Sequence, residues 1–321
     1  MTVTTTHSAT RGASNDAPRV ARAPRRSRFW TIARRDALTG YLFITPQLLG
    51  VLVFVLIPVG LAIYYSLNDW NIFTGQLSFV GGQHYAALLA DPQLPSVLAA
   101  TAMFSGGVVI LNIALGLTLA VMLNRKFRGV TLFRTLFFSP VVVSVVAWTL
   151  VWGFLLQDNG GINGLLALFG IAGPNWLEEG TTAMIAVVFT QVVRSVGINM
   201  VLFLSALQSV PSELYEAARI DGASNRRIFT RVTLPLISPT LLLTAVITIV
   251  GALQAFAQIA VLTEGGPGLS TTVLVYYVFQ QAFSFNNIGY GSTLAIMLLT
   301  FVLLLTVLQW QLRRKWVFYE D

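Results

Sequence analysis

Long apolar stretches separated by short polar segments dominate the chain. No charged residue occurs from Ala37 to Asn68, and similarly apolar stretches recur along the rest of the sequence. A helix needs about 20 mainly apolar residues to cross a bilayer, because it rises about 1.5 Å per residue through about 30 Å of hydrocarbon. The pattern therefore predicts an all-α polytopic membrane protein with six transmembrane helices, which cover about residues 42–67, 97–123, 135–156, 182–207, 240–262 and 291–312.

Polar segments flank this transmembrane domain, which we place at residues 37–312. Residues 1–36 are rich in Thr, Ser, Ala and Arg without apolar periodicity, which is typical of a disordered basic tail. A cleaved signal peptide is the competing interpretation, since basic residues precede an apolar run. That run is much longer than the apolar core of a signal peptide. Residues 313–321 form a second short tail.

Basic residues are confined to alternate loops. Of the 20 Lys and Arg residues, 19 lie before the first predicted span, in the second-to-third loop, in the fourth-to-fifth loop or after the last span. In the other three loops, every charged residue is acidic. The positive-inside rule therefore places both termini in the cytoplasm. The same distribution explains the net charge of +7 by orientation among membrane lipids, without a nucleic-acid partner.

The composition excludes several kinds of chemistry. Apolar residues make up 55% of the chain and charged residues 10%, whereas a soluble domain carries about 25% charged residues. The absence of cysteine excludes disulfides and thiolate metal sites, and the two histidines, His7 and His84, do not form a cluster. We expect no catalytic residue and no metal site. An ion-coupled carrier would need acidic residues within its spans, and the predicted spans contain none.

The loop between the fourth and fifth predicted spans is unusually long. Residues 211–239 read as helix, break, helix. Ser212 is the predicted N-cap, and Glu216 follows close to the positive end of the helix dipole. Gly222 marks the break because glycine adopts a positive φ without penalty, and the second helix is expected to end before Pro235. Both an amphipathic helix on the bilayer surface and an element that docks into a soluble partner fit this pattern.

The spacing in this loop resembles the EAA motif of inner-membrane permeases of binding-protein-dependent ABC importers. That motif has Glu-Ala-Ala, three residues, Gly, nine residues, an aliphatic residue, one residue and Leu-Pro. The chain departs from it only at Val232, where Ile is commoner. The resemblance extends from about Gly40 to Leu312 and is closest to the sugar permeases, near the larger maltose-transporter permease and the glycerol-phosphate permease. It assigns ATPase coupling to Glu216, Ala217, Ala218, Asp221, Gly222, Leu234 and Pro235.

The resemblance implies a type I importer permease in the plasma membrane of a bacterium. Its implied partners are a second permease in a heterodimer, two cytoplasmic ATPase subunits and an extracytoplasmic solute-binding protein. The chain lacks a G-x-x-x-x-G-K-[ST] loop, so ATP and Mg would bind to the partner ATPase, and the permease itself would be no enzyme and hold no cofactor. The implied solute is a mono- or oligosaccharide. Glycerol 3-phosphate or another non-sugar solute is the alternative, and an ion-coupled carrier is a remote one.

Polar residues inside the spans are candidates for the substrate path. Arg194 is the only charged residue in the predicted spans. It either faces the solute path or stabilises the packing of the spans. Gln254 and Gln258, four residues apart, are expected on one face of the fifth span. In the maltose-type permease the sugar lies among the third, fourth and fifth spans. Amides, hydroxyls and an aromatic face suit a polyol, although interhelical hydrogen bonds explain each residue equally well. The candidates are Ser144, Trp148, Arg194, Ser195, Asn199, Thr248, Gln254 and Gln258.

Overall fold

The structure is a computed structural model that describes residues 28–71, 74–125 and 127–316, and the chain divides into two units at Pro58. The first unit contains α1 (Arg28–Val51) and the π-helical turn η1 (Leu52–Leu56), and α2 (Ile57–Ser66) begins at its end. Proline has no N–H to donate, and a π-helical turn precedes Pro58 where the helix passes it. α1 begins at Arg28, within the predicted tail of residues 1–36, and residues 1–27 lie outside the described residues.

The described part of the second unit, residues 59–321, is helical apart from one short hairpin. Its two strands, β1 (Asn68–Asn71) and β2 (Gln76–Phe79), pair antiparallel with Asn68 opposite Phe79. The sequence pattern did not predict this hairpin. The helical elements follow in chain order: α3 (Gln83–Ala90), α4 (Leu94–Leu123), α5 (Val130–Phe138), η2 (Ser139–Val142), α6 (Val145–Leu155), α7 (Gly161–Leu168), α8 (Gly180–Ser209), α9 (Ser212–Ile220), α10 (Asn225–Ile228), η3 (Phe229–Thr233), α11 (Leu234–Leu236), α12 (Ser238–Leu253), α13 (Ala257–Leu262), α14 (Leu274–Phe279), η4 (Gln280–Ser284) and α15 (Ile288–Trp316).

Four helices in the described residues are long and apolar enough to cross a membrane. They are Thr39–Ser66, Leu94–Leu123, Gly180–Ser209 and Ile288–Gln311, and they coincide with the first, second, fourth and sixth predicted spans. Two bent helix pairs also qualify by composition: Val130–Val142 with Val145–Leu155, and Asn225–Leu236 with Ser238–Leu253. The described chain therefore has four candidate spans by length and composition, or up to six if each bent pair counts as one.

The third predicted span is not one continuous helix. Its two halves meet at an angle of 102°, because Val143 and Ser144 have extended backbones with ψ of 138° and 134°. Pro140 has no N–H for a helical hydrogen bond, and the valines that follow it are β-branched and favour extended conformations. The break turns α6 away from the line of α5.

The fifth predicted span is also interrupted. α12 ends at Leu253, the backbone from Gln254 to Phe256 is not helical, and α13 begins at Ala257. The prediction that Gln254 and Gln258 share one helical face is therefore wrong. No glycine or proline marks this break in the sequence. The packing of α13 against α6 stabilises a geometry that local propensity does not encode.

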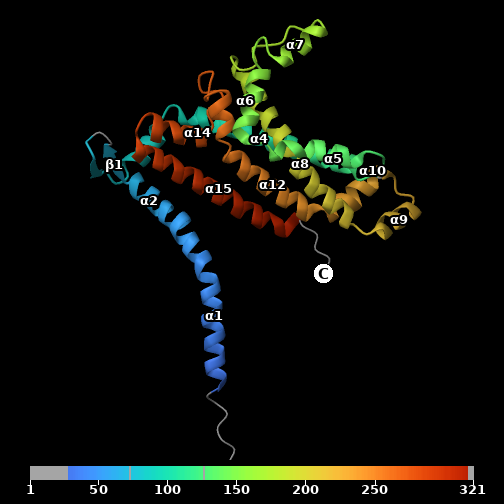
Figure 1. The fold of residues 1–321 in the computed structure, drawn as a ribbon, viewed down its shortest axis with the longest axis horizontal. Helices are drawn as coiled ribbons and strands as arrows, with labels where there is room; N and C mark the ends of the chain where they lie inside the picture. The colour runs from blue at the N-terminus through green and yellow to red at the C-terminus, as the bar shows by residue number, and fades with distance from the viewer. Residues whose placement is uncertain (1–27, 72–73, 126, 317–321) are drawn as a thin grey trace, which may run out of the picture. The chain divides into compact units, whose positions relative to one another are not determined.

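The second unit packs around α4 and α8, with α12 alongside them and α15 packed against α12 (Figure 1). Small residues permit the close approach of α4 to α8. A Cβ on Gly107 would lie 3.2 Å from Val188, and one on Gly116 would lie 3.0 Å from Asn199. Such small residues allow membrane helices to form extensive van der Waals contacts.

The two ends of this bundle carry different loops. Figure 1 shows α5, α10 and α9 at one end, and α14 and β1 toward the other. The basic second-to-third and fourth-to-fifth loops therefore lie at the same end. At the opposite end, the Leu274 N–H donates a 2.8 Å hydrogen bond to the Thr101 hydroxyl and joins the start of α14 to α4.

Asp91 connects three elements at that opposite end. It follows α3, and its Oδ2 accepts hydrogen bonds from the hydroxyls of Tyr277 on α14, at 2.6 Å, and Tyr290 on α15, at 2.5 Å. Its Oδ1 accepts from the Gln93 N–H at 2.8 Å. Burial raises the pKa of Asp91, but these hydrogen bonds outweigh burial and hold the pKa below its ordinary value of 3.8.

We expect this cluster to make the stability of the protein depend on acid pH. Because the pKa of Asp91 is lower in the folded state, its contribution is complete well above pH 3.8 and is lost as the pH falls through the folded pKa. Asp91→Ala leaves two buried tyrosine hydroxyls without an acceptor, at a cost of about 1–3 kcal/mol each. Thermal unfolding of both proteins at pH 7 and below pH 4 checks this. A melting temperature that Asp91→Ala does not lower at pH 7 contradicts it.

Candidate functional site

The loop between α8 and α12 begins with an exposed helix. α9 starts at Ser212, and its N-cap is Pro211, which has an extended backbone and makes no side-chain cap. The prediction of Ser212 as N-cap is wrong by one position, because the fixed φ of Pro211 already directs the chain into the first helical residue. Glu213 in the first turn and Arg219 in the last suit the helix dipole.

A Schellman motif ends α9. The Ala223 N–H donates to the Ala218 carbonyl and the Gly222 N–H to the Arg219 carbonyl, each at 3.0 Å. Gly222 has a φ of +74°, so the predicted glycine turn is confirmed. An L-residue in this left-handed conformation is strained by about 1–2 kcal/mol. The Glu-Ala-Ala segment therefore lies on a short helix whose end is fixed by Gly222.

A second helical stretch leads from this turn to α12. Its first residue follows Ser224, whose hydroxyl accepts the Arg227 N–H at 3.4 Å. The stretch continues from α10 through the π-helical η3 into α11, so the predicted stop before Pro235 is wrong. Pro235 lies at the start of α11, where the missing N–H is tolerated, and a π-helical turn precedes it.

The two helical parts of this loop, α9 and the stretch from α10 to the start of α12, differ in burial. On α9, Glu216 is exposed, and Ile220 and Leu214 are 86% and 37% exposed. In the second helical stretch, Ile228 is buried and Ile237 is only 1% exposed. Ile237 belongs to an apolar cluster with residues at the ends of α4 and α8, such as Leu123. The loop therefore has an exposed helix, α9, and a second helical stretch that is packed into the core at Ile228 and Ile237.

A row of polar side chains follows one face of α8. Gln191, Ser195 and Asn199 are spaced four residues apart, and each contacts a different element. Gln191 Oε1 accepts from Gln258 Nε2 of α13, the Ser195 hydroxyl lies 3.1 Å from Asn112 Oδ1 of α4, and Asn199 Nδ2 donates to Thr248 Oγ1 of α12 at 3.1 Å. The structure thus brings together Ser195, Asn199, Thr248 and Gln258 from the candidate set.

Four candidates lie outside this row. The Trp148 indole donates to the Thr190 carbonyl at 3.1 Å and forms an edge-to-face pair with Trp152. Ser144 is exposed at the break before α6, and Gln254 is exposed at the break after α12. Arg194 on α8 is half-buried, and its Nε has no hydrogen-bond partner among the described residues.

Sequence reasoning missed Asn112 and Gln191. Both are buried amides in apolar helices, with exposed fractions of 0% and 8%. The spacing of Gln191, Ser195 and Asn199 by four residues was the available signal, since buried polar groups in membrane helices find partners on neighbouring helices. Within the part of the chain that the structure describes, no group of three or more His, Cys, Asp or Glu side chains is placed to hold a metal ion.

Replacement of Gln254 and of Gln258 by leucine is expected to affect stability and uptake differently. Gln258 is 3% exposed and bonded to Gln191, so Gln258→Leu leaves a buried amide oxygen unpaired, at about 1–3 kcal/mol. Gln254→Leu at the exposed break leaves the stability unchanged and, if this residue lines the solute path, lowers uptake several-fold. Melting temperature and uptake rate, measured for both variants, check the difference.

The double variant Gln191→Leu with Gln258→Leu is the control. It removes both partners, so its stability recovers relative to Gln258→Leu alone. Normal uptake by Gln254→Leu would remove this residue from the path. Equal destabilisation by the two single variants would contradict the described hydrogen bond.

The fold and this loop define a polytopic membrane protein that exposes a short helix, α9, at the basic end of its helices. The chain belongs to the family of binding-protein-dependent transport system inner membrane components, whose sequence profile matches residues 112–317. It is therefore a transport component and no enzyme, and the family excludes the alternative of an ion-coupled carrier.

Characterised relatives cover nearly the whole chain. The trehalose/maltose transport system permease protein of Thermococcus litoralis is 36% identical over 274 residues, 85% of this chain and 92% of that protein. The multiple sugar-binding transport system permease protein of Streptococcus mutans is 34% identical, with 86% and 95% coverage. The sn-glycerol-3-phosphate transport system permease protein of Salmonella typhimurium is 31% identical, with 87% and 95% coverage.

A solved structure shares the fold. The crystal structure of a bacterial alginate ABC transporter, in complex with an alginate pentasaccharide-bound periplasmic protein, contains a chain that matches with a TM-score of 0.77. The sequence identity is 22%, and the match covers 90% of this chain and 98% of that chain. The type of fold expected for an ABC importer permease is therefore present.

Proposed function

We propose that this protein is the permease subunit of an ABC importer that forms, with a second permease, the path for a mono- or oligosaccharide. The observation that carries the proposal is the α9–Gly222 loop, which presents the Glu-Ala-Ala segment on an exposed helix. The names of the relatives support a carbohydrate, because two of those described above belong to sugar transport systems.

Coupling to ATP hydrolysis is assigned to the same loop. Two cytoplasmic ATPase subunits bind ATP and Mg, and α9 docks into a groove on one of them as an exposed amphipathic helix does. Glu216 forms an ion pair with an arginine of the ATPase. Movement of α9 is transmitted to the ends of α4 and α8 through the second helical stretch, which is buried at Ile228 and Ile237. A solute-binding protein delivers the sugar from the opposite side.

Six spans and cytoplasmic termini complete the proposed topology in a bacterial plasma membrane. It treats each bent helix pair as one span, and the confinement of basic residues to one side supports it. We expect reporter fusions after Asp91, Glu178 and Glu264 to be extracytoplasmic, and fusions after Arg128 and Arg226 to be cytoplasmic. One inverted fusion among the five would require a different number of spans.

The substrate path is assigned to the exposed candidates and to the polar row of α8. Ser144 and Gln254 lie at the two helix breaks, where backbone and side-chain polar groups are available to a polyol. Asn199 and Thr248 are buried and bonded to each other, Gln258 is buried and bonded to Gln191, and these pairs position the helices around the path. Arg194, whose Nε has no hydrogen-bond partner among the described residues, favours the second candidate solute, glycerol 3-phosphate, whose phosphate would pair with it.

Uptake by a deletion strain distinguishes these solutes. We expect loss of the gene to abolish uptake of one labelled sugar from a panel of mono- and oligosaccharides, with restoration by the wild-type gene. Loss of glycerol 3-phosphate uptake, with every sugar unaffected, would support the second candidate and contradict the carbohydrate assignment.

A further inference from the structure

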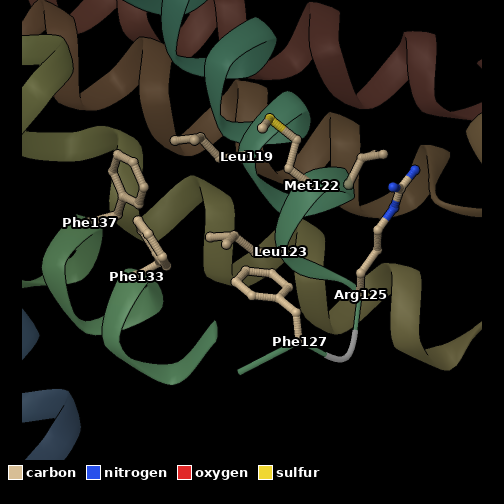
Figure 2. Close-up of a pocket in the computed structure, with 8 residues that line it drawn as sticks. Leu119, Met122, Leu123, Arg125, Phe127, Phe133 and Phe137 are labelled. Atoms are coloured by element: carbon tan, nitrogen blue, oxygen red, sulfur yellow. The ribbon is translucent and has the colours of Figure 1, made fainter. Parts of the chain in front are cut away.

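A groove separates the end of α4 from α5. It encloses about 720 Å³, within the range of small-molecule sites, and is lined mainly by apolar side chains of both helices and their connection. Figure 2 shows Phe133 and Phe137 on α5 facing Leu119 and Leu123 on α4, with Arg125 at the other edge. The groove therefore offers an apolar floor and a cationic edge.

A hydrogen bond joins the end of α4 to α5. Arg134 of α5 donates through Nη2 to the carbonyl of Leu123, the last residue of α4, at 2.7 Å. This bond satisfies a carbonyl that the helix end leaves unpaired. Gly129, with a φ of +89°, is the N-cap of α5, and the rings of Phe127 and Phe133 lie 6.1 Å apart. Arg134 is used for this cap, and Arg125 is the arginine among the residues that line the groove.

The charge of this region has one sign. No Asp or Glu occurs in the sequence between Asp91 and Asp158, whereas four basic residues lie between residues 125 and 134. Met122 and Phe133 are 61% and 47% exposed beside Arg125, which is itself exposed. An apolar surface beside an unpaired cation, at the end of a membrane helix, matches a ligand with an acyl chain and a negative head group.

We infer that this α4–α5 groove binds an anionic phospholipid of the cytoplasmic leaflet. The phosphate pairs with Arg125, since guanidinium groups bind phosphate through charge-assisted hydrogen bonds, and an acyl chain covers the phenylalanines. The inference rests on the proposed orientation, which places this end of the bundle at the cytoplasmic leaflet, where anionic lipids concentrate. A helix of the second permease fits less well, because covering Arg125 with an apolar surface would bury an unpaired charge.

Quenching by brominated lipid tests the site in the assembled importer. The chain is naturally free of cysteine, so Leu132→Cys, exposed on α5 beside the groove, carries a single fluorophore when the partner subunits are also cysteine-free. The complex is placed in phosphatidylcholine nanodiscs, and brominated phosphatidylglycerol is titrated in. We expect saturable quenching, with the half-saturating lipid fraction raised about five-fold by Arg125→Gln, as one charge contributes about 1 kcal/mol.

Matched variants separate this site from general surface charge. Arg226→Gln removes one exposed arginine from the other basic loop and should leave the titration unchanged, and Arg125→Lys, which keeps the charge, should remain close to wild type. Equal quenching by brominated phosphatidylcholine, no quenching by either lipid, or equal effects of Arg125→Gln and Arg226→Gln would overturn the inference. None of these readouts depends on sugar transport, so they leave the proposed function untouched.

Discussion

Glu216→Lys and Gly222→Asp are expected to abolish uptake while the protein still inserts into the membrane. Glu216 is exposed on α9, and a Cβ at Gly222 meets no atom within 4 Å, so neither change disturbs packing within this chain. The φ of +74° at Gly222 adds strain of about 1–2 kcal/mol in Gly222→Asp. A folded span bundle tolerates this strain, but relief of it would change the turn that ends α9 and displace the Glu-Ala-Ala segment from the ATPase. Loss of one partner of a buried charge pair at the ATPase interface costs about 2–5 kcal/mol, so coupling falls about 30-fold or more.

Glu213→Lys is the matched control, because it makes the same charge change on the same exposed helix. Glu213 lies in the first turn, where the dipole contributes only about 0.3–1 kcal/mol, so most uptake should remain. Uptake, membrane content and co-purification of the ATPase are measured together. Wild-type uptake by Glu216→Lys, or equal losses for Glu213→Lys and Glu216→Lys, would contradict the assignment of coupling to Glu216.

Gly197→Ala is expected to destabilise the helix bundle strongly. A Cβ at Gly197 of α8 would overlap the Phe137 carbonyl oxygen and lie 2.8 Å from the Phe137 carbonyl carbon of α5. Backbone atoms on two packed helices cannot move apart without disturbing the neighbouring contacts. Overpacking of this kind costs about 1–3 kcal/mol, and occasionally more, so the amount of folded protein and the melting temperature should both fall.

Gly106→Ala on α4 is the comparison, because a Cβ there meets no atom within 4 Å. It also removes a mid-helix glycine, which favours the helix by up to about 1 kcal/mol, so its melting temperature should not fall. Thermal unfolding of the two purified variants decides the point. Equal melting temperatures would show that α5 and α8 are not in the described contact.

The sequence predicted those features that depend on local pattern. Apolar length located the helices at Thr39–Ser66, Leu94–Leu123, Gly180–Ser209 and Ile288–Gln311 to within a few residues. Motif spacing predicted α9 and the turn at Gly222, because a left-handed residue after a helix strongly favours glycine. The roles of Glu216 and its neighbours stay predictions, since they concern a partner chain.

Features that depend on tertiary contacts could not be predicted from the sequence. The break at Gln254 contains no glycine or proline, and it arises where α13 packs against α6. The hydrogen-bond partners of Asn199 and Gln258 lie 49 and 67 residues away in sequence, so only the folded bundle pairs them. The polar row on α8 was visible as a spacing of four, but its role in joining α4, α12 and α13 was not.

Reconstituted uptake tests the central claim most directly. The chain is assembled with its second permease and ATPase subunits in proteoliposomes, with ATP on the side of α9 and the sugar-loaded binding protein on the opposite side. We predict uptake only when both are present, and none with Glu216→Lys. Uptake that a proton or sodium gradient drives without ATP, or that continues undiminished without the binding protein, would contradict the account.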